Sequence, residues 1–176
     1  MKCKGNSAAY WITARKRGVF LVVWSAFMVI NTAWAATIQG PVTVVVDYVI
    51  DGDSLMVGRD GKAMEVRLWG IDAPEYDQAG SGQSREALKR LVNGKKGELS
   101  IKYRDRYDRY VAVLTIGKIN VNKEMIRAGH SWVYERYCNE SPCEEWGDLQ
   151  AVARKKRRGL WRGTDPVPPW RWKAER

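Results

Sequence analysis

The sequence predicts an α+β protein, mainly β in content, that folds as a five-stranded barrel with about three packed helices. Five short runs of β-branched and apolar residues, separated by polar or Gly-containing segments, indicate the strands. Three further segments place apolar residues at helical spacing. The chain has 176 residues, of which 45% are hydrophobic and 28% charged, so one globular domain is expected rather than a disordered chain.

The strands are expected where β-branched and apolar residues are densest. They cover residues 42–50, 54–57, 63–69, 98–103 and 110–116. The pair Asp60-Gly61 lies between the second and third runs and is a typical hairpin turn. The polar segment 104–109 separates the last two strands.

The helices are expected at residues 84–92, at residues 122–128, and from Pro142 until Gly159 ends the third helix. Ser141 as N-cap, with Glu144 three residues later, predicts a capping box for the third helix. The proline-rich segment 166–170 is expected to be extended. This succession of short strands and helices in one small domain favours a barrel of the OB type.

The first 35 residues are predicted to be a signal peptide. Five positive charges precede a short apolar run at residues 19–30, and Ala33-Trp34-Ala35 suits signal peptidase. The run is shorter than the roughly 20 residues that span a membrane. An uncleaved N-terminal anchor is the alternative. Cleavage predicts a secreted or periplasmic protein without membrane attachment, with a domain at residues 36–163 and a Pro/Trp/Arg-rich tail at 164–176.

Removal of that segment would also remove Cys3 and leave Cys138 and Cys143. An even number of cysteines in an exported chain favours a disulfide, and their spacing suits a small loop. The alternative, a metal site, would need two more soft ligands that the sequence does not offer. A disulfide between Cys138 and Cys143 is therefore the prediction.

The formal charge of +10 and a single histidine restrict the chemistry. Zinc-finger arrays and His₃ or HExxH metal sites are excluded, and a nucleophile with a histidine base would have to use His130. Carboxylates and arginines must therefore do most of any catalysis. The run of five cations at residues 154–158 suits contacts with phosphates that need no base recognition, although it also suits a solvated helix end.

Acidic residues follow two predicted strands, as Asp51 and Asp53 and as Asp72 and Glu75. Carboxylates that converge repel each other unless protons or a cation intervene, and oxygen ligands favour a hard cation. Arg67 and Arg109 lie on neighbouring segments and could hold a phosphate through two-donor contacts. The alternatives are two ordinary acidic turns and a self-paired charged loop.

Three segments together resemble the signature segments of the staphylococcal nuclease (thermonuclease) family. They are Ile50-Asp-Gly-Asp-Ser54, Val66-Arg-Leu-Trp-Gly-Ile-Asp-Ala-Pro-Glu75 and Asp105-Arg-Tyr-Asp-Arg109, in the same order and with similar gaps. The resemblance covers roughly residues 42 to 162. It implies an OB-fold barrel with three helices and calcium-dependent, sequence-non-specific endonucleolytic hydrolysis of DNA and RNA that leaves 3′-phosphates.

The resemblance also implies a calcium site. Asp53 and Asp72 match the calcium carboxylates, the backbone carbonyl of Ala73 matches a further ligand, and Asp51 matches an outer acid. Ala73 stands where the best-known member of the family has threonine, which is harmless if only its carbonyl binds. The implied cofactor is therefore Ca²⁺.

The resemblance assigns catalytic roles to Glu75, which would orient or deprotonate the attacking water, and to Arg67 and Arg109 as a phosphate clamp. Tyr107 and Tyr137 match nucleotide-contacting residues. Tyr134 and Trp132 compete with Tyr137 for base stacking, and Trp132 suits the core better.

The substrates implied are DNA and RNA, with no obligate protein partner and a monomeric state. A non-catalytic nucleic-acid-binding OB-fold protein is the alternative function. The retained acids and arginines argue against it.

Overall fold

The structure is a computed structural model that describes residues 40–176. The predicted signal peptide, its cleavage site and Cys3 lie outside the described residues. Within the part that is described, no helix is long and apolar enough to cross a membrane.

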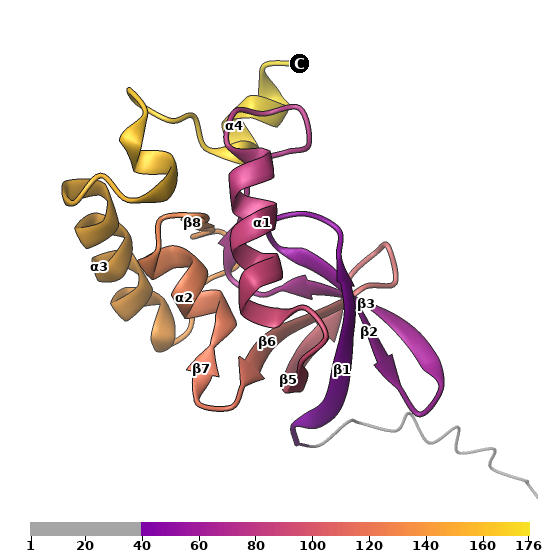
Figure 1. The fold of residues 1–176 in the computed structure, drawn as a ribbon. Coiled ribbons are helices and arrows are strands. Elements are labelled where there is room, and N and C mark those ends of the chain that lie inside the picture. The colour runs from indigo at the N-terminus through magenta and orange to yellow at the C-terminus, as the bar shows by residue number, and fades with distance from the viewer. Residues whose placement is uncertain (1–39) are drawn as a thin grey trace, which may run out of the picture. The chain divides into compact units, whose positions relative to one another are not determined.

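The predicted five-stranded barrel is confirmed (Figure 1). Its strands are β1 (Val42–Val49), β2 (Ser54–Arg59), β3 (Lys62–Leu68), β5 (Lys96–Arg104) and β6 (Tyr110–Ile116). Antiparallel pairing joins β3, β2, β1, β5 and β6 in that order, and a parallel pairing of β3 with β6 closes the barrel. The closure places the end of β3 beside the start of β6. Predicted site residues follow β3 and precede β6, so the closure brings these two segments to the same end of the barrel.

Three two-residue strands were not predicted. They are β4 (Ile71–Asp72), which pairs with β8 (Trp132–Val133), and β7 (Ile119–Asn120), which extends the sheet beyond β6. Such short strands are defined by their partners, because two residues cannot show a sequence period. The pairing of Asp72 with Trp132 holds the backbone of one predicted site residue.

The three predicted helices are present, as α1 (Ser81–Val92), α2 (Val121–Arg127) and α3 (Pro142–Lys155). A 3₁₀ helix, η1 (Gly159–Arg162), and a short helix, α4 (Pro169–Ala174), follow them. Helix α1 begins before the expected residue, because Gly80 adopts a left-handed conformation with φ of 91° and starts the helix directly after it.

Three local predictions were wrong. Gly159 does not end the third helix, because α3 ends at Lys155 and Arg157 after it adopts a left-handed conformation with φ of 48°. Ser141 precedes α3 but makes no side-chain cap, because its φ and ψ of −44° and −41° are helical, whereas a capping residue is normally extended. The tail is not extended throughout, because α4 starts at Pro169. Proline has no N–H to lose at a first helical position, and the extended Pro168 before it leads into the helix.

The core fills the barrel and the space beneath α1 and α2. Inward-facing valines of β1 alternate with exposed residues, as a half-buried strand requires. Buried Asn122 on α2 accepts the N–H of Leu114 and donates to the carbonyl of Trp69, at 3.0 and 2.9 Å. A second cluster joins Trp132, Ala153, Leu160 and Trp161, so that the prediction of Trp132 as a core residue is confirmed.

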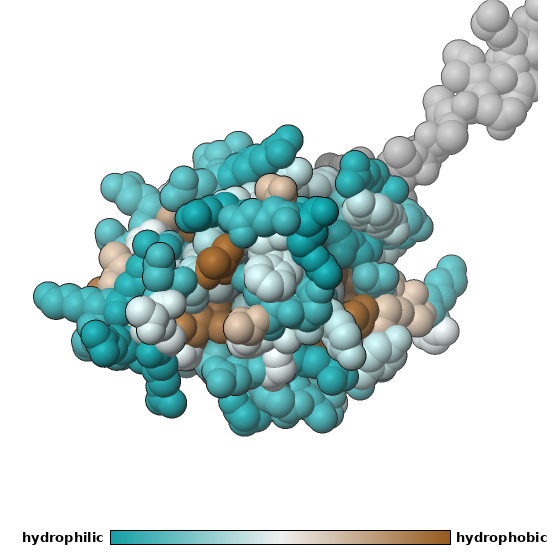
Figure 2. Space-filling view, turned by 90° about the horizontal axis from the view of Figure 1, so that it is seen from above, coloured by the Kyte–Doolittle hydropathy of each residue, from teal (hydrophilic) through white to brown (hydrophobic). Residues whose placement is uncertain are grey.

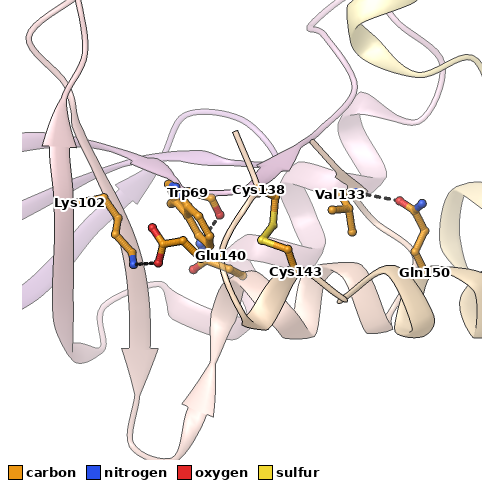
Figure 3. The surroundings of a disulfide bond; sticks show 8 residues. Trp69, Lys102, Val133, Cys138, Glu140, Cys143 and Gln150 are labelled. Atoms are coloured by element: carbon orange, nitrogen blue, oxygen red, sulfur yellow. Dashed lines mark hydrogen bonds and ion pairs between the residues drawn. A yellow bond between two sulfur atoms is a disulfide. The ribbon is translucent and has the colours of Figure 1, made fainter. Parts of the chain in front are cut away.

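The predicted disulfide between Cys138 and Cys143 is present, with a Cα–Cα distance of 5.5 Å. It links the loop after β8 to the first turn of α3 (Figure 3). Nearby, the Nζ of Lys102 lies 2.6 Å from Glu140 and 4.9 Å from the centre of the Trp69 ring. The disulfide therefore fastens a loop that covers one side of the barrel.

Candidate active site

The turn between β1 and β2 directs the side chain of Asp53 into the protein. The Oδ1 of Asp51 accepts the backbone N–H groups of Asp53 and Ser54, at 2.9 and 2.7 Å. An aspartate that bonds the backbone two residues ahead fixes a tight turn. Asp51 is thus occupied with shaping the turn, while the side chain of Asp53 is buried, with 2% of the residue exposed.

Gly52, between these two acids, packs against α1 and the loop after β4. A Cβ atom at this position would lie 2.0 Å from the Oγ of Ser84 and 2.6 Å from the Cβ of Ala73. The hydroxyl of Ser84 donates to the carbonyl of His130 at 2.7 Å, so it is not free to move aside. A glycine is therefore required for the close approach of the turn to its neighbours.

Asp53, Arg67 and Asp72 form one buried cluster. The guanidinium of Arg67 pairs with Asp53, and its other terminal nitrogen lies 2.6 Å from the Oδ1 of Asp72. The Oδ2 of Asp53 accepts the N–H of Ala73 at 2.6 Å. The structure thus brings together four of the residues predicted for the site.

The Oδ2 of Asp72 is buried and has no hydrogen-bond partner. Burial raises the pKa of Asp72 above its usual value, although the positive charges of Arg67 and Lys173 oppose this shift. In the described residues, no group of three or more His, Cys, Asp or Glu side chains is placed to hold a metal ion. The donor set is nevertheless all oxygen, and the unpartnered oxygen fits a hard cation whose remaining ligands are backbone, water or substrate.

Glu75 lies on the loop after β4 and is held at both its backbone and its side chain. Its N–H donates to the Oε1 of Gln78 at 3.1 Å, and Gln78 donates in turn to the carbonyl of Val167 at 2.6 Å. Its Oε1 lies 2.7 Å from the Nζ of Lys173 on α4. The C-terminal tail therefore packs directly against the predicted catalytic glutamate.

Arg109 precedes β6 and contacts Asp105 rather than the acidic pair. Its Nε and a terminal nitrogen lie 2.9 and 2.7 Å from the Oδ2 of Asp105. Desolvation by itself would raise the pKa of Asp105, but hydrogen bonds from Arg109 and from the N–H of Tyr107 lower it. The ion pair favours the charged form of Asp105 and orients Arg109 directly before β6, the strand that runs beside β3.

Solvent exposure distinguishes the tyrosines that could contact a nucleotide. Tyr107 is 63% exposed, and the guanidinium of Arg109 lies 5.4 Å from its ring centre. Tyr137 is 46% exposed, whereas the competing Tyr134 is stacked on Trp170 of α4 with ring centres 5.3 Å apart. Tyr137 is therefore the more accessible of the two.

Sequence reasoning missed Tyr103, Gln78 and Lys173. Burial raises the pKa of Tyr103, nearby Tyr137 and Asp105 raise it further, and the charge of Arg67 lowers it, so this tyrosine lies within electrostatic reach of Arg67 and Tyr137. Tyr103 follows an irregularity in the β5–β6 pairing, where strand alternation fails as a guide to facing. Gln78 contacts Val167, and Lys173 contacts Glu75. These partners are far apart in the sequence, so no local pattern predicts the contacts.

Comparisons with known proteins agree with this geometry. A family model described as staphylococcal nuclease homologue matches residues 65–163. An uncharacterized endonuclease of Escherichia coli O157:H7 is 44% identical over 126 residues, which are 71% of this chain and 80% of that protein. An uncharacterized endonuclease of Haemophilus influenzae is 33% identical over 155 residues, covering 88% of this chain and 85% of that protein. A probable staphylococcal-like nuclease of Oryza sativa subsp. japonica is 31% identical over 110 residues, which are 62% of this chain but 29% of that protein.

The family model and the nuclease relatives, together with a closed barrel that carries buried acids and half-buried arginines near the ends of its strands, place the protein in the class of phosphodiester-hydrolysing nucleases. Within that class, the chain belongs to the staphylococcal nuclease family, because the family model and the bacterial relatives match most of the described domain.

The packing at Gly52 leads to a prediction about stability. We expect Gly52→Ala to destabilise the protein by about 1–3 kcal/mol, since the added methyl group must displace Ser84 or Ala73. The matched control is Gly147→Ala in α3, where nothing lies within 4 Å of the new Cβ and a gain of about 0.4–1 kcal/mol is expected. Urea denaturation of both variants measures the difference. Equal stabilities would contradict the packing described for the turn.

Proposed function

We propose that the protein is a calcium-dependent, sequence-non-specific endonuclease that hydrolyses DNA and RNA and leaves 3′-phosphates. The observation that supports this most directly is the buried pair of carboxylates joined by Arg67, with one carboxylate oxygen left unpartnered. A protein with only a structural use for these acids would be expected to satisfy every buried oxygen.

Asp53 and Asp72, with the backbone carbonyl of Ala73, would hold the calcium ion. Their oxygens suit a hard cation that takes 6–8 ligands and tolerates irregular geometry. When bound, the ion supplies positive charge that stabilises the developing charge on the phosphate and polarises its oxygens. Asp51 supports this site indirectly, since its carboxylate fixes the turn that carries Asp53.

Arg67 and Arg109 are proposed to bind the scissile phosphate. A guanidinium offers two parallel donors to phosphate oxygens, and such donors stabilise charge that grows in the transition state. In the structure Arg67 is paired with Asp53 and Asp72. Arg109 is paired with Asp105, and these ion pairs hold both guanidinium groups in place before substrate arrives. Preorganised donors avoid reorganisation during the reaction.

Glu75 is proposed to orient the attacking water and to accept its proton. Such a role depends first on geometry, and the hydrogen bond from its N–H to Gln78 fixes the position of its backbone. One carboxylate oxygen contacts Lys173, which leaves the other for a water molecule. Tyr107 and Tyr137 are proposed to contact the nucleotide through their exposed rings.

The alternative is a barrel that binds nucleic acid without cleaving it. The chain keeps both acids, both arginines and the glutamate, and four of the predicted residues are in direct contact. We therefore favour the enzyme. We also propose export through the N-terminal segment, which the disulfide supports because such bonds persist in oxidising compartments. A monomer without an obligate partner remains our expectation.

Substitutions at the proposed phosphate clamp test the mechanism. Arg67→Lys and Arg109→Lys keep the charge but lose the two-donor fork, so we expect turnover to fall by roughly 10²–10³, or about 3–4 kcal/mol. Glu75→Gln should lower kcat by a similar factor or more. The measurement is calcium-dependent cleavage of a short DNA oligomer by folded variants. Equal rates for wild type and Glu75→Gln would show that Glu75 and the acidic residues beside it do not form the active site.

The contact with Lys173 leads to a prediction about positioning. An exposed ion pair contributes about 1 kcal/mol or less, so we expect Lys173→Ala to lower kcat about threefold to fivefold with little change in KM. Lys173→Arg should restore most of the rate. Arg171→Ala, on the same helix, is the control because Arg171 is exposed and does not contact Glu75. An unchanged or higher kcat in Lys173→Ala would refute a positioning role.

A further inference from the structure

A large groove lies beside the proposed catalytic loop. Its volume is about 1200 Å³, and it is bounded by one face of α1, the end of α2, the segment after α3 and the first part of the tail. Gln78, which holds Glu75, forms part of its wall. The groove therefore begins next to the proposed site without containing its acids or its arginines.

Positive charge dominates the lining of this groove. Six cationic side chains contribute to it, against the two acids Glu86 and Asp165. The six are Arg90, Arg127, Lys156, Arg157, Arg158 and Arg162. Glu86 lies 3.9 Å from Lys89, so part of its charge is already compensated, and Arg127 is likewise paired with Glu124 at 2.6 Å. The other five cations have no ion pair with a described residue. The groove thus concentrates positive charge from four separate elements.

Two of these cations, Arg90 and Arg162, lie near His130, which also lines the groove. Burial lowers the pKa of His130, and the positive charges of Arg90 and Arg162 lower it further. Both guanidinium groups are thus close enough to His130 to disfavour a third positive charge. Like charges gathered in a concave surface cost free energy unless an anion compensates them.

The basic run after α3 divides into two parts in the structure. Arg154 packs over the Trp161 ring at 4.4 Å, which is a structural contact. Lys156, Arg157 and Arg158 instead line the groove. Arg157 has a φ of 48°, in the left-handed region that glycine normally occupies after a helix. A large cationic side chain therefore occupies a position whose backbone conformation favours glycine.

The tail connects the groove with the proposed site. Trp172 lines the groove, and Lys173 beside it contacts Glu75. Figure 2 views the side of the molecule where α4 lies, and this surface is mostly hydrophilic with small, separate hydrophobic patches. Such a surface suits a charged ligand better than an apolar partner.

We propose that this groove is a second nucleic-acid site, which binds the sugar–phosphate backbone of a polynucleotide strand at a distance from the bond that is cleaved. The occupant is a polynucleotide because only an extended polyanion can reach charges along the whole groove and also enter the adjacent site. The proposal rests on the proposed nuclease function for the role that the groove plays in the reaction. Binding of a strand to the groove does not require cleavage. The groove would retain long substrates and add little to short ones.

The binding test uses a labelled single-stranded oligonucleotide of about 30 nucleotides in the presence of a chelator, so that no cleavage occurs. Removing one cation that binds a phosphate of a single strand should reduce the slope of log affinity against log salt by about 0.7. We therefore expect Arg90→Gln with Arg162→Gln to reduce the slope by about 1.4. The control, Lys62→Gln with Lys118→Gln, removes the same charge at exposed positions outside the groove. Equal slopes for the two double variants would overturn the proposal.

A third variant separates binding from folding. Arg157→Gly should leave the melting temperature equal to or above that of wild type, because glycine accepts the left-handed conformation, and it should still weaken oligonucleotide binding. A variant that binds like wild type would count against the site.

Turnover distinguishes this proposal from the proposed function. With calcium, the groove variants should raise KM for long DNA and leave cleavage of a single-diester chromogenic substrate unchanged. Absence of cleavage by wild type would overturn the nuclease proposal, while the binding results would still decide the groove. A loss of single-diester cleavage in the groove variants would overturn the groove as a separate site.

Discussion

The structure of the proposed site depends on one arrangement, the bridging of two buried carboxylates by the guanidinium of Arg67. Burying a carboxylate is unfavourable unless an opposite charge or several hydrogen bonds compensate it. Arg67 supplies that charge to Asp53 and Asp72, and the N–H of Ala73 supplies a further bond. The turn after β1, the end of β3 and the loop after β4 are thereby tied together. The same arrangement leaves one oxygen of Asp72 unpartnered, where a cation can act.

The sequence predicted the parts of this arrangement that are local. The strands and the positions of Asp53, Arg67 and Asp72 follow from β-branched runs and from motifs at fixed spacing. The contacts of the tail could not be predicted, because Gln78 and Val167 are 89 residues apart and no periodic pattern links them. The capping box failed for a physical reason, since Ser141 is itself helical and its side chain makes no cap. A strand as short as β4 forms only by pairing with β8, which lies far away in the sequence. The orientation of Arg109 by Asp105 cannot be predicted from their spacing alone.

The C-terminal segment adds two features to the barrel. It holds the loop of Glu75 through Gln78 and Lys173, and it forms one wall of the positive groove. Stacking of Trp170 on Tyr134 fixes the segment against the domain. It also covers one face of a tyrosine that could otherwise stack on a base, which leaves Tyr107 and Tyr137 as exposed aromatic contacts. The tail therefore belongs physically to the domain, although its composition differs.

The central claim is that Asp53 and Asp72 form a calcium site held in shape by Arg67. Calcium titration by calorimetry, without nucleic acid, tests it most directly on folded wild type, Asp53→Asn, Asp72→Asn and the control Glu98→Gln, which changes an exposed acid on β5. The account predicts one site in wild type and in the control. Affinity in each aspartate variant should be lower by about tenfold or more, since a direct ligand is removed. Absence of calcium binding by wild type, or equal affinity in all four proteins, would contradict the account.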